Sequence, residues 1–270
     1  MNASITNTFI AKDKFELIQS TIDYPLEQSD DGWISGRFFH HKITSVFQPI
    51  INATQNKTLG HIAYILSEGE ITLSPWQAFA KAANDEELAN LDSLCRTIHI
   101  LNYFNKANSS YKLFVEVHPR LLESAQSNHN QTFEDLLNLI GVKTSRVVIE
   151  IPPIINRNWK LLQKMIDNYR SHGYQIAATY YKGSSSNWMS DLCNLYPDIV
   201  RIKASYLLYH HIINTIIRAT HSSGIRILVC DIGAYEQLLA ARRSGADYLQ
   251  GDFLSKPTRA IHAVSPRFTP

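Results

Sequence analysis

Hydrophobic residues in this chain gather in short runs rich in β-branched and aromatic side chains, separated by longer stretches with a different periodicity. Such runs, bounded by turn-forming residues, predict β-strands. Eight strands are expected, over residues 43–50, 58–67, 113–117, 146–151, 175–181, 199–204, 226–231 and 248–251.

The stretches between the later strands have the spacing of amphipathic helices. In residues 155–169, Ile155, Trp159, Leu162, Ile166 and Tyr169 recur every three or four positions, which places them on one helical face. Similar patterns predict helices over residues 85–106, 130–140, 205–222 and 234–244. Glycine just beyond such a stretch is a helix stop, and three such positions are Gly173, Gly224 and Gly245.

The first connection differs from the others because it is too short to hold a crossover. Residues 51–57 can join neighbouring strands only as a hairpin, so the first strand should be antiparallel to the second. From residue 113 onward strands alternate with helices and should be parallel. This rhythm predicts a TIM-like (β/α)8 barrel with an antiparallel first strand; an open doubly wound sheet is the alternative.

Composition narrows the class of protein. With 26 basic and 24 acidic residues the formal net charge is +2, which gives no electrostatic reason to expect nucleic acid or membrane binding. The cysteines Cys95, Cys193 and Cys230 are scattered, which argues against a disulfide framework or a zinc site. No signal peptide and no apolar run of membrane-spanning length is visible, so we expect a cytoplasmic protein.

The strand ends carry a recognisable series of motifs. VFQPI (46–50), LFVEVHPRLL (113–122), RVVIEI (146–151), YPDIVRIKASYL (196–207) and GADYLQGDFLSKP (245–257) follow one another at characteristic spacings. In this order they resemble the bacterial EAL domain, the cyclic-di-GMP phosphodiesterase family, over residues 40–260. Residues 1–39 are then a polar N-terminal extension that could form a helical arm, and residues 261–270 are a C-terminal tail.

The resemblance fails at the chemical positions. The family's enzymes use two divalent metals, and the resemblance implies that the ligand and catalytic positions fall here on Ile62, Glu116, Glu150, Thr179, Tyr180, Arg201 and Cys230. The formal charge summed over these positions is −4 in the family pattern and only −1 here, so the site is less acidic. Two dications need hard oxygen ligands that offset their charge. We therefore expect no metal cofactor and no phosphodiesterase activity.

Polar side chains nevertheless remain at the strand ends. A vestigial pocket that could still meet a ligand is expected from Gln48, Glu116, Glu150, Arg201, Lys203 and Gln250. Glu116 and Glu150 are expected to pair with Arg201 and Lys203; a single-metal site that adds Asp231 is the alternative. Cys230 is expected as a small buried residue rather than a reactive thiol.

Three functions follow from this comparison. The first is an inactive EAL-type protein, monomeric or homodimeric, that binds a transcriptional regulator or signalling protein controlling motility, adhesion and biofilm, or virulence. That role is implied by the resemblance to degenerate family members. The second is a receptor that binds cyclic di-GMP without metal, which is less expected because Ile62 and Leu66 replace polar family residues. The third and least expected is an active phosphodiesterase.

Overall fold

The computed structural model describes residues 10–68, 75–119, 121, 129–152, 159–180, 195–208, 211–261 and 263. The chain divides into two compact units, and strands β3 (His41–Asn52) and β4 (Thr58–Glu68) contribute to both. The first unit contains residues 1–46, 64–108 and 126–143, and the second contains residues 47–63, 109–125 and 144–270. None of the helices in the described ranges is long and apolar enough to cross a bilayer.

The first unit packs helices on a small antiparallel sheet. Strand β2 (Ile34–Phe38) pairs with β1 (Leu26–Gln28) on one side and with β3 on the other. Helix α3 (Asp85–Phe104) covers β2, and Asn102 accepts from Ile34 N at 2.6 Å and donates to Ile34 O at 2.7 Å. Helices α1 (Lys12–Gln19), α2 (Pro75–Phe79) and α5 (His129–Ile140) complete this unit.

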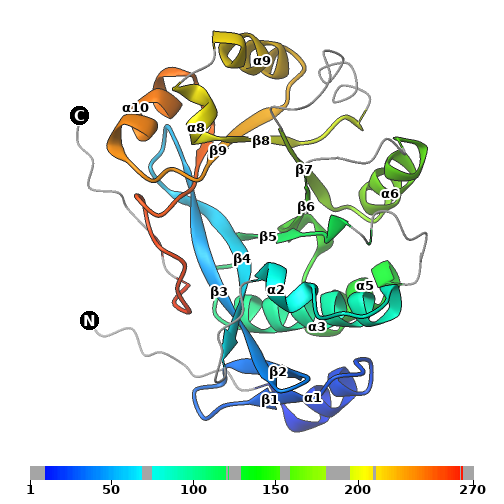
Figure 1. Cartoon of the computed structure of the whole chain (residues 1–270). Helices are drawn as coiled ribbons and strands as arrows, with labels where there is room; N and C mark the ends of the chain where they lie inside the picture. Colours follow the sequence, from blue (N-terminus) through cyan, green and yellow to red (C-terminus); the bar gives the residue numbers. More distant parts are fainter. Residues whose placement is uncertain are drawn as a thin grey trace. The chain divides into compact units, whose positions relative to one another are not determined.

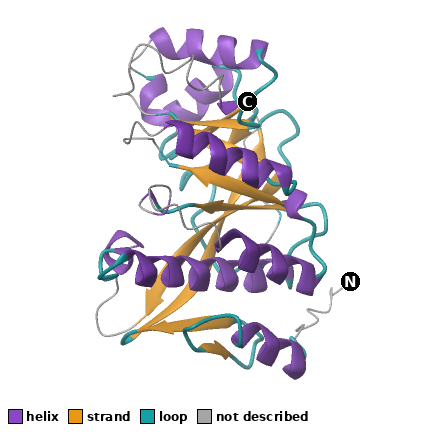
Figure 2. Cartoon of the chain, turned by 90° about the vertical axis from the view of Figure 1, so that its right-hand side faces the viewer, coloured by secondary structure: helices purple, strands orange, loops and turns teal. Residues whose placement is uncertain are grey.

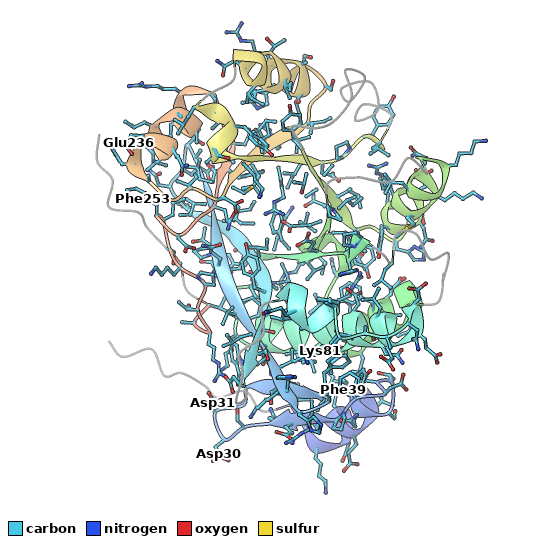
Figure 3. The ribbon with its side chains drawn as sticks, viewed as in Figure 1. Asp30, Asp31, Phe39, Lys81, Glu236 and Phe253 are labelled. Atoms are coloured by element: carbon cyan, nitrogen blue, oxygen red, sulfur yellow. The ribbon has the colours of Figure 1, made fainter. Side chains whose placement is uncertain are left out.

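Residues 1–39, expected as a polar extension, therefore carry strands as well as a helix. Asp30 and Asp31 form the turn between β1 and β2, where Asp31 Oδ1 accepts from Trp33 N at 3.1 Å (Figure 3). Phe39, at the next turn, is 54% exposed although its neighbour Phe38 is fully buried. Strands β1 and β2 place this segment in the same sheet as β3.

The second unit closes the barrel. The strand order is β3–β10–β9–β8–β7–β6–β5–β4, and an additional β3–β4 pairing joins the ends (Figure 1). The remaining strands are β5 (Lys112–Glu116), β6 (Val147–Ile151), β7 (Gln175–Thr179), β8 (Ile199–Lys203), β9 (Arg226–Cys230) and β10 (Tyr248–Leu249). Neighbours from β4 to β10 are parallel, whereas β3 is antiparallel to β10. The expected eight-stranded barrel and its antiparallel first strand are confirmed.

Helices cover the outer side of these strands. Figure 1 shows α6 (Trp159–Ser171), α9 (His211–Ser222) and α10 (Tyr235–Arg243) outside β6–β9, and Figure 2 shows strands in orange with helices in purple beside them. The segment expected as one helix over 205–222 forms α8 (Ala204–Leu207) and α9 instead, with 209–210 outside the described residues. A one-turn 3₁₀ helix, Thr144–Arg146, precedes β6.

A continuous apolar core lies between the strands and these helices. Alternate residues of β8 and β9, including Val200, Ile202, Ile227 and Val229, are fully buried against α9 and α10. Strands of a parallel sheet covered by helices are apolar for this reason. The core fixes the strands so that their carboxyl ends meet at one end of the barrel, called the mouth below.

Candidate functional site

The mouth brings together the charged residues expected there. Glu116 and Glu150 are direct neighbours in the parallel pairing of β5 and β6. Arg201 stands on β8, and Lys203 follows it at the end of the same strand. All four belong to the second unit, so their geometry can be compared directly.

Glu150 and Arg201 form a buried ion pair. Arg201 Nη1 donates to Glu150 Oε2 at 2.8 Å, and the two side chains are 10% and 0% exposed for Arg201 and Glu150 respectively. Burial raises the pKa of Glu150 to about 7, against the opposing effect of the Arg201 charge and with Glu116 and Asp231 adding to the rise. Among the described residues Glu150 Oε1 has no hydrogen-bond partner.

Glu116 differs from Glu150 because water reaches its side chain. The protein surrounding the mouth still removes part of its hydration, and this burial raises its pKa. The charges of Arg201 and Lys203 act in the opposite direction, while Asp231 adds to the rise. Glu116 is thus coupled to the ion pair by charge.

Lys203 has a different partner from the one expected. Its Nζ lies 3.4 Å from Asp231 Oδ2, and both side chains are about half exposed, at 50% and 53%. Asp231 has a φ of 59°, in the left-handed region, directly after β9. The expected pairing is therefore confirmed for Glu150 with Arg201. Lys203 instead forms an ion pair with Asp231.

The two glutamines form a hydrogen-bonded group of their own. Gln250 Nε2 donates to Gln48 Oε1, and Gln48 Nε2 donates to Asp252 Oδ1 and Ser255 O, each at 2.8 Å. Both glutamines are only 2% exposed. Asp231 N contacts Gln250 Oε1 at 3.4 Å, which links this group to the mouth. Sequence reasoning missed Asp252, although its position directly after Gln250 and Gly251 was a usable signal.

Three positions expected to differ from the family pattern are buried or packed against aromatic side chains. Ile62 is 2% exposed and Cys230 is 1% exposed, and burial raises the pKa of the Cys230 thiol to about 11. Tyr180 packs edge-on against Tyr206, with ring centroids 5.7 Å apart. Residues 181–194, which include Cys193 and the last residue of the strand expected over 175–181, lie outside the described residues.

The described residues offer few ligands for a metal. Within those ranges no three His, Cys, Asp or Glu side chains come together as a metal-binding group. Glu150 already accepts from a guanidinium, and Asp231 lies beside an ammonium group.

A match to a family model agrees with this fold. Residues 34–257 match the EAL domain. The chain belongs to the EAL domain family.

Among EAL proteins, the chain is similar to the uncharacterized EAL-domain containing protein YkuI of Bacillus subtilis (strain 168). The two are 28% identical over 229 residues, which covers 80% of this chain and 55% of YkuI. The chain thus spans about half the length of that relative.

Solved EAL structures show the same barrel. The crystal structure of B. subtilis YkuI, in complex with substrate c-di-GMP and calcium, matches with a TM-score of 0.70 at 25% identity, covering 82% of this chain and 57% of that one. The standalone versatile EAL protein of Vibrio cholerae O395, in its c-di-GMP bound form, matches with a TM-score of 0.70 at 18% identity, covering 83% and 96%. At that identity the second likeness shows the fold alone.

Proposed function

We propose that this chain is a catalytically inactive EAL domain that acts by binding another protein, a transcriptional regulator or signalling protein controlling motility, biofilm formation or virulence. The observation that carries the proposal is the Arg201–Glu150 pair. Glu150 is the family's ligand carboxylate retained in this sequence, and a guanidinium 2.8 Å away occupies it. A cation that is part of the chain takes the place of one that would have to be bound.

The other positions support the same proposal. A pair of dications a few ångströms apart requires several carboxylates to offset its charge. Here Ile62 is apolar and buried, and Cys230 holds its proton because burial raises its pKa to about 11. The side chains present at these positions do not fit two divalent metals.

Activity assays test the inactivity directly. The purified chain is incubated with cyclic di-GMP and Mg²⁺ or Mn²⁺, with an active EAL enzyme as the positive control, and the products are separated by chromatography. We expect the dinucleotide to stay cyclic. Accumulation of the linear dinucleotide in proportion to the amount of this chain would refute the proposal.

A metal-independent cyclic-di-GMP receptor is the second candidate. Two observations favour it: a solved structure of the similar protein YkuI contains c-di-GMP, and Lys203 presents a half-exposed ammonium group at the mouth. Calorimetric titration with the dinucleotide, with and without divalent metal, separates the two candidates. Saturable heat without turnover supports the receptor, and a flat titration supports protein binding alone.

The partner itself requires a separate measurement. Proteins captured from a bacterial lysate by the immobilised chain are identified, purified and titrated against it. A purified partner that forms a stoichiometric complex of about micromolar affinity supports the proposal. Failure of every captured protein to bind again in purified form contradicts it.

A further inference from the structure

The end of the barrel opposite the mouth carries an excess of positive charge. Here the parallel strands of the second unit begin and the helices that precede them end. We call this end the basic face and take it as the connecting segments, the last turn of each helix and the first residue of each strand. In the described part of the unit these positions hold the cations Lys57, Lys112, Arg146, Arg170, Arg226 and the Arg242–Arg243 pair.

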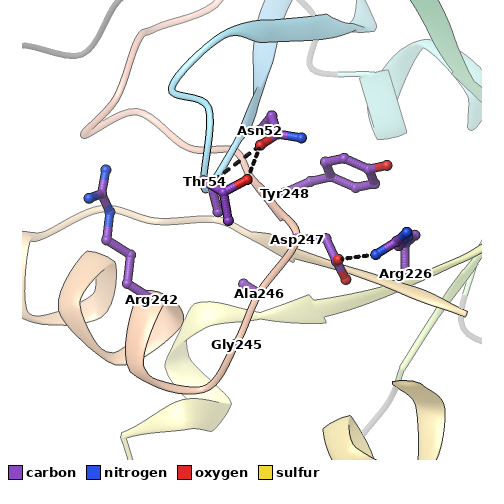
Figure 4. A pocket seen from close by; sticks show the side chains of 9 residues that line it. Asn52, Thr54, Arg226, Arg242, Gly245, Ala246, Asp247 and Tyr248 are labelled. Carbon is purple, nitrogen blue, oxygen red and sulfur yellow. Dashed lines mark hydrogen bonds and ion pairs between the residues drawn. The ribbon is translucent and has the colours of Figure 1, made fainter. Parts of the chain in front are cut away.

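Few acidic side chains oppose these seven cations. Within the described residues of the basic face they are Asp198 and Asp247, so its formal charge is +5, against +2 for the whole chain. Figure 4 shows Asp247 holding Arg226, with Oδ1 and Nη1 2.9 Å apart, and this pair adds no net charge. The carboxyl ends of α6, α9 and α10 oppose the remaining charge by about half an elementary charge each, which leaves the face basic.

An exposed aromatic residue lies on the same face. Tyr196, shortly before β8, is 71% exposed, the highest value for a large hydrophobic side chain in the described ranges. Its φ of 45° lies in the left-handed region, which glycine adopts freely and a bulky residue adopts only with strain. Arg170 Nη2 donates to the carbonyl oxygens of Leu195 and Tyr196, so the end of α6 holds this backbone in place.

These features are typical of an interaction surface. Strained backbone occurs mainly at functional sites. Tyrosine and arginine are enriched among the residues that carry the binding energy of protein interfaces, and here Arg170 lies directly beside Tyr196. Opposite charge across an interface guides association and selects the partner. The net charge of the whole chain, +2, favours a protein partner over a nucleic acid.

We propose that the basic face, with Tyr196 as its aromatic contact, binds an acidic segment of a partner protein. The tyrosine ring supplies apolar contact area, and the cations attract the carboxylates of the partner. Arg170 donates to backbone carbonyls and Arg242 to Asn56 Oδ1, and these hydrogen bonds to neutral oxygens leave both positive charges in place. The inference rests on the function proposed above, because it names the surface through which an inactive barrel would act.

Peptide display tests the partner chemistry. Short random peptides are selected for binding to the wild-type chain, and the peptides obtained are synthesised and titrated by fluorescence anisotropy. We expect them to be rich in Asp and Glu, and their affinity to fall as the salt concentration rises. The same peptides with Asn and Gln in place of these acids should bind at least about tenfold more weakly.

Two variants locate the contact. Tyr196→Gly removes the ring and also relieves the left-handed backbone, so its melting temperature should equal or exceed that of the wild type. It should nevertheless bind the selected peptides at least about tenfold more weakly. Tyr235→Ala removes another exposed tyrosine, at the mouth end of the unit, and is the matched control with unchanged binding. A purely structural role for Tyr196 would instead lower the melting temperature and leave the peptide affinity intact.

Several results would overturn the proposal: no enriched peptide, selected peptides without an acidic excess, or equal affinity for the wild type and Tyr196→Gly. Duplex DNA that binds more tightly than the acidic peptides, and through Tyr196, would overturn the partner class. A purified partner that binds Tyr196→Gly as tightly as the wild type would refute this surface and leave the proposed function standing. A chain that binds neither the peptides nor any purified protein would refute both.

Discussion

Arg201 Nη1 lies 2.8 Å from Glu150 Oε2, and the two side chains join β8 to β6 across the barrel mouth. Because both residues are nearly or fully buried, loss of either partner should lower the free energy of unfolding. The same pair therefore contributes to the stability of the barrel and occupies the Glu150 carboxylate at the mouth.

Removal of one member of the Arg201–Glu150 pair should lower the free energy of unfolding far more than removal of both. Arg201→Met leaves the Glu150 carboxylate buried without its cation, and we expect a loss of about 3–5 kcal/mol in the free energy of unfolding. The double variant Glu150→Leu with Arg201→Met replaces the pair with apolar groups and should recover most of that loss. Urea unfolding of both variants and of Glu150→Leu alone completes the cycle. Strictly additive losses would show that the two side chains are not coupled.

The pH dependence of stability should report Glu150. Its folded-state pKa of about 7 lies above the ordinary 4.5, so between these values the native chain holds a proton that the unfolded chain has released. Its contribution to stability is therefore complete below pH 4.5 and decreases as the pH rises to about 7, by at most about 1.4 kcal/mol per pH unit. Denaturant unfolding from pH 5 to 8 measures this slope.

Two variants isolate that effect. Glu150→Gln should lose this part of the slope, whereas Glu86→Gln, which changes an exposed carboxylate on α3, should keep it. Matching pH profiles for the wild type and Glu150→Gln would exclude Glu150 as the source.

Restoring an acid at Ile62 should harm the fold. Ile62 is 2% exposed, and a carboxylate there would lose its hydration on burial. We expect Ile62→Glu to lower the free energy of unfolding by several kcal/mol and to leave the chain without phosphodiesterase activity. Ile62→Val is the control, with a loss of about 0.5–1.5 kcal/mol. An Ile62→Glu chain as stable as the control would mean that the mouth still accommodates an acid there.

The close approach of β4 and β5 requires glycine at residue 60. A Cβ on Gly60 would lie 2.0 Å from Lys112 O, whereas one on Gly233 would meet nothing closer than Gln237 Oε1 at 3.7 Å. Gly60→Ala should therefore destabilise the barrel by about 1–3 kcal/mol or more, and Gly233→Ala should change it by less than about 0.5 kcal/mol. Thermal unfolding compares the two directly. Equal melting temperatures would show that β4 can move away from β5 without loss of stability.

The buried cysteines should resist labelling. Cys95 and Cys230 are 4% and 1% exposed, and burial raises the pKa of both thiols, that of Cys230 to about 11. In a Cys193→Ser variant we expect no rapid reaction with a disulfide reagent at pH 8, because the thiolate is the reacting form. Guanidinium chloride should then release both thiols. Fast labelling of the folded variant would show that one of them reaches solvent.

Local patterns in the sequence determined the elements of this fold. The periods of strands and helices depend on neighbouring residues, so the eight strands and the antiparallel hairpin through residues 51–57 were readable in advance. Glycines placed as helix stops were also readable: Gly224 and Gly245 have φ values of 76° and 85°, just beyond α9 and α10. The motif order indicated the EAL family, and the residues that differ from its motifs are the ones on which the proposed inactivity rests.

Tertiary structure alone decided the partners of the polar side chains. Gln48 and Gln250 meet across 202 residues of sequence, and Lys203 binds Asp231 rather than Glu116. Strand register and burial set such contacts, and neither is encoded in the residues next to the side chain. The same holds for Asp247, which contacts Arg226 and His221 at sequence separations of 21 and 26 residues. Short-range periodicity therefore fixed the scaffold, and long-range packing fixed what its polar groups do.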